Sequence, residues 1–143
     1  MDQTIRDGRL EDAADIAALL TQLGYPSDEP AVEERIDRLQ IVGDRIVVAE
    51  VEGKVAGVAH LQVTPALERH APVARIGALV VDEAYRGQGI GRALVDAVEA
   101  EARLRGCELL YVTTSNDRND ARAFYQRLGL EVTGRRYSRT LSE

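Results

Sequence analysis

Three glycines at alternate positions follow an apolar run in the second half of the chain, with an arginine on either side of them. These residues are Arg86, Gly87, Gly89, Gly91 and Arg92. Glycine lets a backbone approach a ligand closely, and the first turn of a helix presents N–H groups that lack internal partners. The helix dipole and two guanidinium groups favour negative charge at the same place. The segment therefore predicts a cradle for a pyrophosphate group.

Three phosphate-binding patterns compete for this segment. A P-loop requires G-x-x-x-x-G-K-[ST], but when it is counted from Gly87 its second glycine falls on Arg92. A dinucleotide fingerprint requires G-x-G-x-x-G, and its third glycine falls on Arg92 or, from the next start, on Leu94. An R-x-x-G-x-G turn is satisfied by Arg86 with the second and third glycines. The spacing therefore favours the third pattern.

Two segments together carry a resemblance to a known family. Residues 79–91 read LVVDEAYRGQGIG and resemble the acetyl-CoA-binding motif of the GNAT superfamily of N-acetyltransferases. Residues 116–130 resemble the family's later motif, an Asn or Arg followed by A-x-x-F-Y-x-x-x-G-F, with Leu130 in place of the common Phe. The resemblance covers nearly the whole chain. It implies a single GNAT domain over residues 1–143 that uses acetyl-CoA as its cosubstrate.

The resemblance also implies which residues contact acetyl-CoA. Backbone N–H groups from Gln88 to Arg92 would hold the pyrophosphate. Leu79 and Val81 would pair with the pantetheine arm as if it were an added strand, and an amide of the Val80–Val81 segment would stabilise the oxyanion on the thioester. The residues expected at this binding site are Leu79, Val80, Val81, Arg86, Gly87, Gln88, Gly89, Ile90, Gly91, Arg92 and Asn119.

Two residues of the later motif receive roles from the same resemblance. Tyr125 would face the CoA sulfur, where its hydroxyl, protonated at neutral pH, can donate a proton to the departing thiolate. Asn119 would bond the pantetheine. Arg118 and Asn116 are alternatives to it, and a helix N-cap is an equally good explanation of Asn119.

The implied reaction is direct transfer of the acetyl group to a primary amine of a small molecule or peptide. Many relatives carry an acid just before the position of Leu79, where this chain has Gly77 and Ala78. The residue that takes the proton of the amine therefore stays open, and the candidates are His60, Glu50, His70, Glu68 or a chain of waters. Because this acid is missing, an alternative function stays open. The chain would then be a non-catalytic GNAT-fold module that binds or senses CoA.

The remaining pattern predicts the elements that position these motifs. Strands are expected around Ile5 and over 45–51, 54–63, 73–81 and 109–113, with one or two more over 130–140. Helices are expected over 10–23, 30–40, 89–105 and 119–128. This order predicts an α/β fold with a mixed sheet. The resemblance adds that the sheet splays at the acetyl-CoA site and that about four helices flank it.

Composition limits the partners of the chain. A net charge of −6 and only 4% aromatic residues over 143 residues argue against a nucleic-acid binder. No apolar run approaches the roughly 20 residues of a membrane span, so we expect no membrane partner. The lone Cys107 is typical of a reducing, cytoplasmic location, and two His with one Cys are too few for a structural zinc site. We also expect a homodimer, which is common in the family, and an acidic surface that could face a cationic acceptor.

Overall fold

The computed structural model describes residues 2–114 and 119–142. Five strands form one sheet in the order β1 (Gln3–Asp7), β2 (Arg45–Val51), β3 (Lys54–Thr64), β4 (Val73–Val81) and β5 (Leu109–Val112). Neighbouring strands are antiparallel from β1 to β4, whereas β5 runs parallel to β4. The expected α/β fold with a mixed sheet is therefore confirmed.

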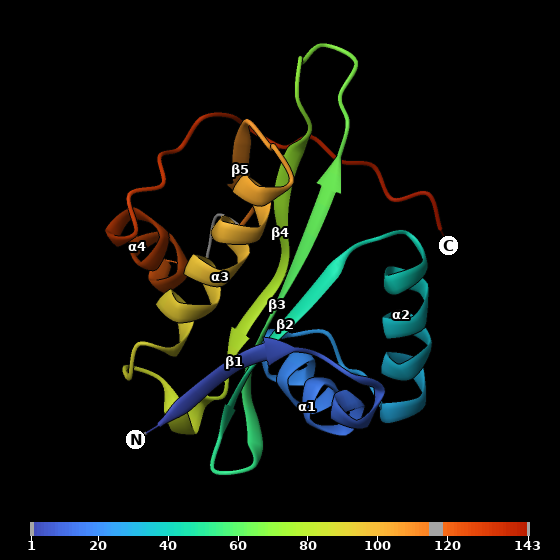
Figure 1. The fold of residues 1–143 in the computed structure, drawn as a ribbon, viewed down its shortest axis with the longest axis vertical. Coiled ribbons are helices and arrows are strands. Elements are labelled where there is room, and N and C mark those ends of the chain that lie inside the picture. The colour runs from blue at the N-terminus through green and yellow to red at the C-terminus, as the bar shows by residue number, and fades with distance from the viewer. Residues whose placement is uncertain (1, 115–118, 143) are drawn as a thin grey trace.

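Within the described residues, four helices cover the two faces of this sheet (Figure 1). They are α1 (Ala13–Leu23), which a short 3₁₀ turn over Leu10–Asp12 precedes, α2 (Glu29–Ile41), α3 (Ile90–Leu104) and α4 (Asn119–Arg127). A second 3₁₀ turn, Glu83–Tyr85, connects β4 to the glycine-rich segment. Helices α1 and α2 lie on one side of the sheet, and α3 and α4 lie on the other (Figure 1).

Each face of the sheet has its own apolar core, because alternate residues of a strand point to opposite sides. Val48 and Val58 pack with Ile36 in the core under α1 and α2. Val47 and Ala59 pack in the core under α3, with Leu94 among others. The central strands β2 and β3 are therefore apolar on both faces, which explains the continuous Val and Ala runs in the sequence.

The ladder around β4 is irregular at two points. Ala59 pairs with Leu79 and Leu61 with Ile76, so that the single residue His60 of β3 faces two residues of β4, Gly77 and Ala78. This is a β-bulge, which bends a strand and redirects its side chains.

The second irregularity is on the other edge of β4. Strand β5 pairs with β4 only from Val73 to Ile76. From Gly77 to Val81, no strand of the described residues pairs with that edge, which we call the open edge of β4. The sheet is therefore open along this part of β4, at the place where the family resemblance implied a splay.

The predicted strands over 130–140 are wrong. Residues 130–142 form no helix or strand, and Val132, Tyr137 and Leu141 are between 83% and 92% exposed. The reason is that these apolar residues are scattered among charged and small polar ones, so a strand here would not bury a continuous face. The other expected elements are present, with ends that differ from the predicted ones by no more than three residues.

Ion pairs connect β2 to the outer strand β1 and to helix α3. Arg45 of β2 contacts Asp7 of β1 at 2.6 Å and Glu101 of α3 at 2.8 Å. Arg105 also binds Glu101, and the guanidinium groups of Arg105 and then Arg45 hold the pKa of Glu101 below its ordinary value.

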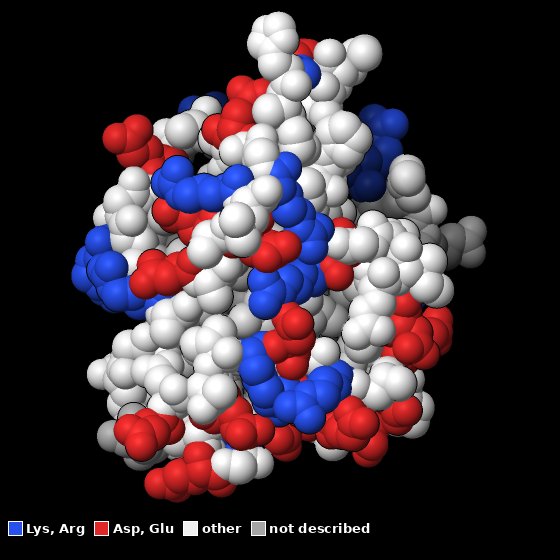
Figure 2. Space-filling view, in the orientation of Figure 1, with Lys and Arg blue, Asp and Glu red and all other residues white. Residues whose placement is uncertain are grey.

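Figure 2 shows basic and acidic side chains interleaved down the middle of the face that it draws, so the acidic excess does not gather there into one patch. Within 2–114 and 119–142, no helix combines the length and apolarity that crossing a membrane requires.

Candidate active site

The open edge of β4 presents backbone groups in a defined pattern. Asp82 N–H donates to the Ala56 carbonyl at 2.8 Å, which marks this pair as a hydrogen-bonded position of the antiparallel ladder. Because such positions alternate, Leu79 and Val81 direct their N–H and C=O groups away from β3, toward the open edge. These are the two residues that the sequence predicted to pair with pantetheine.

Asp82 organises the turn that follows β4. Its side chain is 11% exposed, and its carboxylate accepts a hydrogen bond from Ala84 N–H at 3.0 Å and lies 3.4 Å from Lys54 Nζ. The Ala84 N–H, and after it the Lys54 ammonium, hold the pKa of Asp82 below its ordinary value. Arg86 turns back onto the strand, where its Nε donates to the Val81 carbonyl at 3.0 Å. The turn thus fixes the direction in which the chain leaves β4.

The glycine turn, residues Arg86–Gly91, leads into an uncapped helix. Gly87 and Gly89 adopt left-handed φ angles of 81° and 82°, which favour glycine. A Cβ at either position would have no neighbour within 4 Å, and no side chain of the described residues caps the start of α3. The first hydrogen bond recorded there runs from Ala93 N–H to the Gly89 carbonyl at 3.1 Å.

The N–H groups at the start of α3 are consequently available to an anion. Arg92 is exposed beside them, whereas the Ile90 side chain is buried in the core. A pyrophosphate therefore fits this turn, with Ile90 able to contribute only its backbone.

Helix α4 packs against the start of α3 through Phe124. A Cβ at Gly91 would lie 3.1 Å from Phe124 Cζ, so this glycine allows the close approach of the two helices. Tyr125 is half-buried and its ring lies edge-on to that of Phe124, with centroids 5.3 Å apart. The structure thus brings the two sequence motifs together. Asn119 begins α4, and its Oδ1 accepts a hydrogen bond from Arg122 Nη2 at 2.6 Å. The alternatives Arg118 and Asn116 lie outside the described residues.

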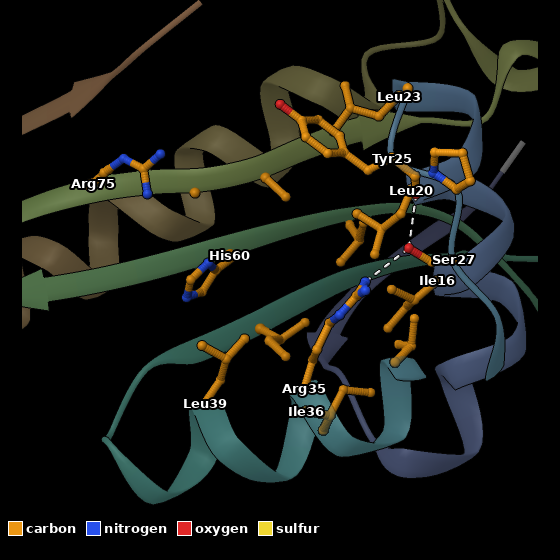
Figure 3. A pocket seen from close by; sticks show the side chains of 17 residues that line it. Ile16, Leu20, Leu23, Tyr25, Ser27, Arg35, Ile36, Leu39, His60 and Arg75 are labelled. Carbon is orange, nitrogen blue, oxygen red and sulfur yellow. Dashed lines mark hydrogen bonds between the residues drawn. The ribbon is translucent and has the colours of Figure 1, made fainter. Parts of the chain in front are cut away.

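A cavity of about 630 Å³, which we call the α2 pocket, lies between the sheet and helices α1 and α2 (Figure 3). Its apolar wall includes Ile16, Leu20, Leu23, Ile36, Leu39 and Val58. Its polar side chains are Tyr25, Ser27, Arg35, His60 and Arg75. Gly77 and Ala78 of the bulge also line it, so the pocket reaches the point where the open edge of β4 begins.

His60 is held in this pocket by Asp44. The two side chains are 17% and 7% exposed, and His60 Nε2 lies 2.8 Å from Asp44 Oδ2. An ionised Asp44 accepts a hydrogen bond, which assigns the proton to Nε2 and leaves the lone pair of His60 on Nδ1. Nδ1 faces Gly77 so closely that a Cβ there would overlap it.

The structure places the four side chains that the sequence offered as proton acceptors in different surroundings. Glu50 binds Arg6 at 3.0 Å, and Glu68 and His70 are exposed in the loop between β3 and β4. Of these four, only His60 lines the α2 pocket. Sequence reasoning missed its partner Asp44, which follows the Gly43 turn and carries no motif of its own.

The chain belongs to the Acetyltransferase (GNAT) family, whose profile matches residues 13–130. It is 36% identical over 89 residues to an aminoalkylphosphonate N-acetyltransferase of Salmonella typhimurium, a match covering 62% of this chain and 58% of that protein. It is 29% identical over 140 residues to an aminoglycoside N(6')-acetyltransferase type 1 of Stenotrophomonas maltophilia, covering 92% and 88%. A crystal structure of a Trypanosoma brucei acetyltransferase superposes with a TM-score of 0.84 at 26% identity, over 98% of this chain and all of that one.

The match thus spans less than two thirds of the length of the Salmonella relative. Membership of this family makes acetyl-CoA the cosubstrate. The glycine turn and the open edge of β4 provide the backbone groups that such a donor needs.

Proposed function

We propose that this chain is an N-acetyltransferase that moves the acetyl group of acetyl-CoA directly to a primary amine of a small molecule or peptide. The observation that carries the proposal is the continuity of β4. Gly77 and Ala78 line the α2 pocket, Leu79 and Val81 present backbone groups at the open edge, and the glycine turn follows. One strand therefore joins a pocket for an acceptor to a cradle for a donor.

In this proposal, the donor lies along the open edge of β4. The pyrophosphate binds the N–H groups at the start of α3, with Arg92 adding positive charge. Pantetheine pairs with the outward backbone groups of Leu79 and Val81, and Asn119 contributes from α4. Arg86 shapes the turn by binding the Val81 carbonyl.

The acetyl transfer itself needs three groups of this chain. The amine nitrogen attacks the carbonyl carbon of the thioester, and a backbone N–H at the open edge of β4 stabilises the developing oxyanion. The C–S bond then breaks, and the Tyr125 hydroxyl donates its proton to the sulfur. His60 Nδ1 takes the proton of the amine, directly or through water, and Asp44 stabilises the resulting imidazolium.

The names of the relatives do not select one acceptor. One is named for an aminoalkylphosphonate and another for an aminoglycoside, and both names share only the acetylated amine. The proposal also includes one domain over residues 1–143, a cytoplasmic location and a homodimer. The free thiol of Cys107 supports the location. Sedimentation velocity of the purified chain tests the dimer.

Two measurements test the proposed function against the alternative of a CoA sensor. Calorimetry should detect acetyl-CoA binding at ligand concentrations up to about 1 mM, and its absence there would contradict both functions. A thiol-release assay over a panel of amines then separates them, because only the enzyme releases CoA in an amine-dependent way. Tyr125→Phe should lower the rate of release about 100-fold with little change in acetyl-CoA affinity. An unchanged rate would remove Tyr125 from the mechanism.

A further inference from the structure

The charged side chains of the α2 pocket have one sign. Arg35 of α2 and Arg75 of β4 both line it, together with His60, and no Asp or Glu is among its described lining residues. Figure 3 shows Arg35 rising from α2 and Arg75 standing on β4, on opposite sides of the hollow, with His60 on the strand between them. This is unexpected for a chain with a net charge of −6. The acidic surface that the sequence expected to face a cationic acceptor does not line this pocket.

Neither arginine is neutralised within the described part of the chain. Arg35 Nη1 donates to Ser27 Oγ at 2.8 Å, and Arg75 Nη1 makes only a long contact of 3.5 Å to Gln62 Oε1. Arg35 is exposed, whereas Arg75 is partly buried and differs from the partly buried Arg6 and Arg45, which bind carboxylates. Among residues 2–114 and 119–142, Arg35 and Arg75 form no ion pair.

We propose that the α2 pocket selects an amine that also carries an anionic oxyacid group, either a carboxylate or a phosphonate. Guanidinium groups bind such anions through paired, charge-assisted hydrogen bonds. The amine would reach the bulge at Gly77, the anion would lie between Arg35 and Arg75, and an apolar substituent would cover Leu20 and Leu39. A polycationic acceptor would instead meet two uncompensated positive charges. This inference rests on the proposed acetyl transfer and names the substrate class of that same site.

A matched set of amines tests the inference through the anionic-to-neutral ratio, which is kcat/KM for an anionic acceptor divided by kcat/KM for a neutral one. Leucine, its phosphonate analogue 1-amino-3-methylbutylphosphonate, leucinamide and 3-methylbutylamine share the apolar part and differ in the anion. We expect kcat/KM for at least one of the two anionic members to exceed that for the neutral members by at least about tenfold. A preference for leucine identifies the carboxylate and a preference for the phosphonate identifies that group. Equal values, or a preference for leucinamide or 3-methylbutylamine, would overturn the inference while leaving amine acetylation intact.

Substitutions of the two pocket arginines, with a control on α2, assign the effect to the pocket. Arg35→Gln and Arg75→Gln should each reduce the anionic-to-neutral ratio severalfold, and together they should bring it close to one. Arg38→Gln is the matched control, because Arg38 also lies on α2 but binds Glu34 at 3.6 Å and does not line the pocket. A ratio that survives both pocket substitutions, or that falls equally in Arg38→Gln, would overturn the assignment.

Binding of the reaction product gives a readout that needs no turnover. Calorimetry should show tighter binding of N-acetyl-leucine, or of its phosphonate counterpart, than of N-acetyl-leucinamide, and the double Gln variant should lose this difference. If the preference is present but no amine is acetylated, the anion site stands and the proposed enzyme fails. If amines are acetylated without any such preference, the enzyme stands and the anion site fails.

Discussion

The donor and acceptor sides of this molecule are built in different ways. The donor side is one continuous segment, from the open edge of β4 through the glycine turn to α3, and its expected ligands are mostly backbone groups. The α2 pocket takes side chains from α1, α2, β2, β3 and β4 and from the loop between the two helices. In the proposed function, backbone conformation would therefore specify the donor, whereas separate side chains would specify the acceptor.

Two helix starts show the same contrast on a smaller scale. Helix α2 is closed by Asp28, whose carboxylate accepts a hydrogen bond from Ala31 N–H at 2.9 Å, and Pro30 stands in its first turn. Helix α3 begins at Gly89 without a side-chain cap among the described residues. A cap usually contributes about 1 kcal/mol to stability. The N-terminus of α3 lacks that contribution, and its N–H groups remain available to a ligand.

The largest expected effect comes from breaking the donor side. Gly89→Val places a β-branched residue at a φ of 82°, in the path of the pyrophosphate. We expect acetyl-CoA affinity, measured by calorimetry, to fall at least about 100-fold. Gly106→Val is the matched control, because Gly106 lies past the opposite end of α3 with a φ of 76° and equally open surroundings.

Both glycine substitutions should cost a similar free energy of unfolding, about 1–2 kcal/mol for a left-handed branched residue. Urea unfolding measures this cost. If Gly106→Val weakens acetyl-CoA as much as Gly89→Val does, the loss reflects general strain, and the cradle at the glycine turn is wrong.

A smaller effect should follow from disturbing the acceptor side without touching the donor. In Gly77→Ala the new Cβ would overlap His60 Nδ1, so the imidazole must turn and loosen its bond to Asp44. We expect kcat to fall about tenfold, less than full loss of a general base, with acetyl-CoA affinity unchanged.

A double-mutant cycle sharpens this prediction. In a His60→Gln background, Gly77→Ala should change kcat little, because the group that it displaces is already absent. Losses that multiply across the two substitutions would show that Gly77 acts on catalysis by another route than His60.

The smallest expected effect concerns the turn between the two sides. Asp82→Asn removes the carboxylate that binds Ala84 N–H and Lys54, and we expect the free energy of unfolding at pH 7 to fall about 1 kcal/mol. Because the pKa of Asp82 is lowered in the folded chain, its contribution is present at neutral pH and is lost as the carboxylate protonates.

The difference in stability between wild type and Asp82→Asn should therefore shrink as pH falls below about 4. Urea unfolding at pH 7 and at several acidic values measures it. Glu83→Gln, at the exposed neighbouring position, should give a small difference throughout. A wild-type advantage over Asp82→Asn that does not change with pH would contradict the role of the charge.

Sequence reasoning predicted one side of the molecule much better than the other. The spacing of Gly87, Gly89 and Gly91 predicts the turn because left-handed backbone and close approach are local demands that glycine meets. The strand 73–81 was predicted with its observed bounds, since a central strand is apolar on both faces.

The α2 pocket could not be predicted in the same way. Arg35, His60 and Arg75 are far apart in the chain, and only the packing of α2 onto β3 and β4 brings them to one cavity. Asp44 had no local signal, because its role is its distance to His60. The strands predicted over 130–140 failed for the reverse reason, because a local pattern was present but no tertiary packing supported it. A few apolar residues suggested a strand, and no buried face was available to receive it.

The open edge of β4 has a consequence for handling the protein in solution. Unpaired backbone groups on an apolar strand are a template for pairing with any other extended chain, including another molecule of the same protein. A donor that pairs with Leu79 and Val81 as an added strand would cover that template. We therefore expect acetyl-CoA to act as a solubilising agent, keeping concentrated protein dispersed at levels where the ligand-free chain forms aggregates.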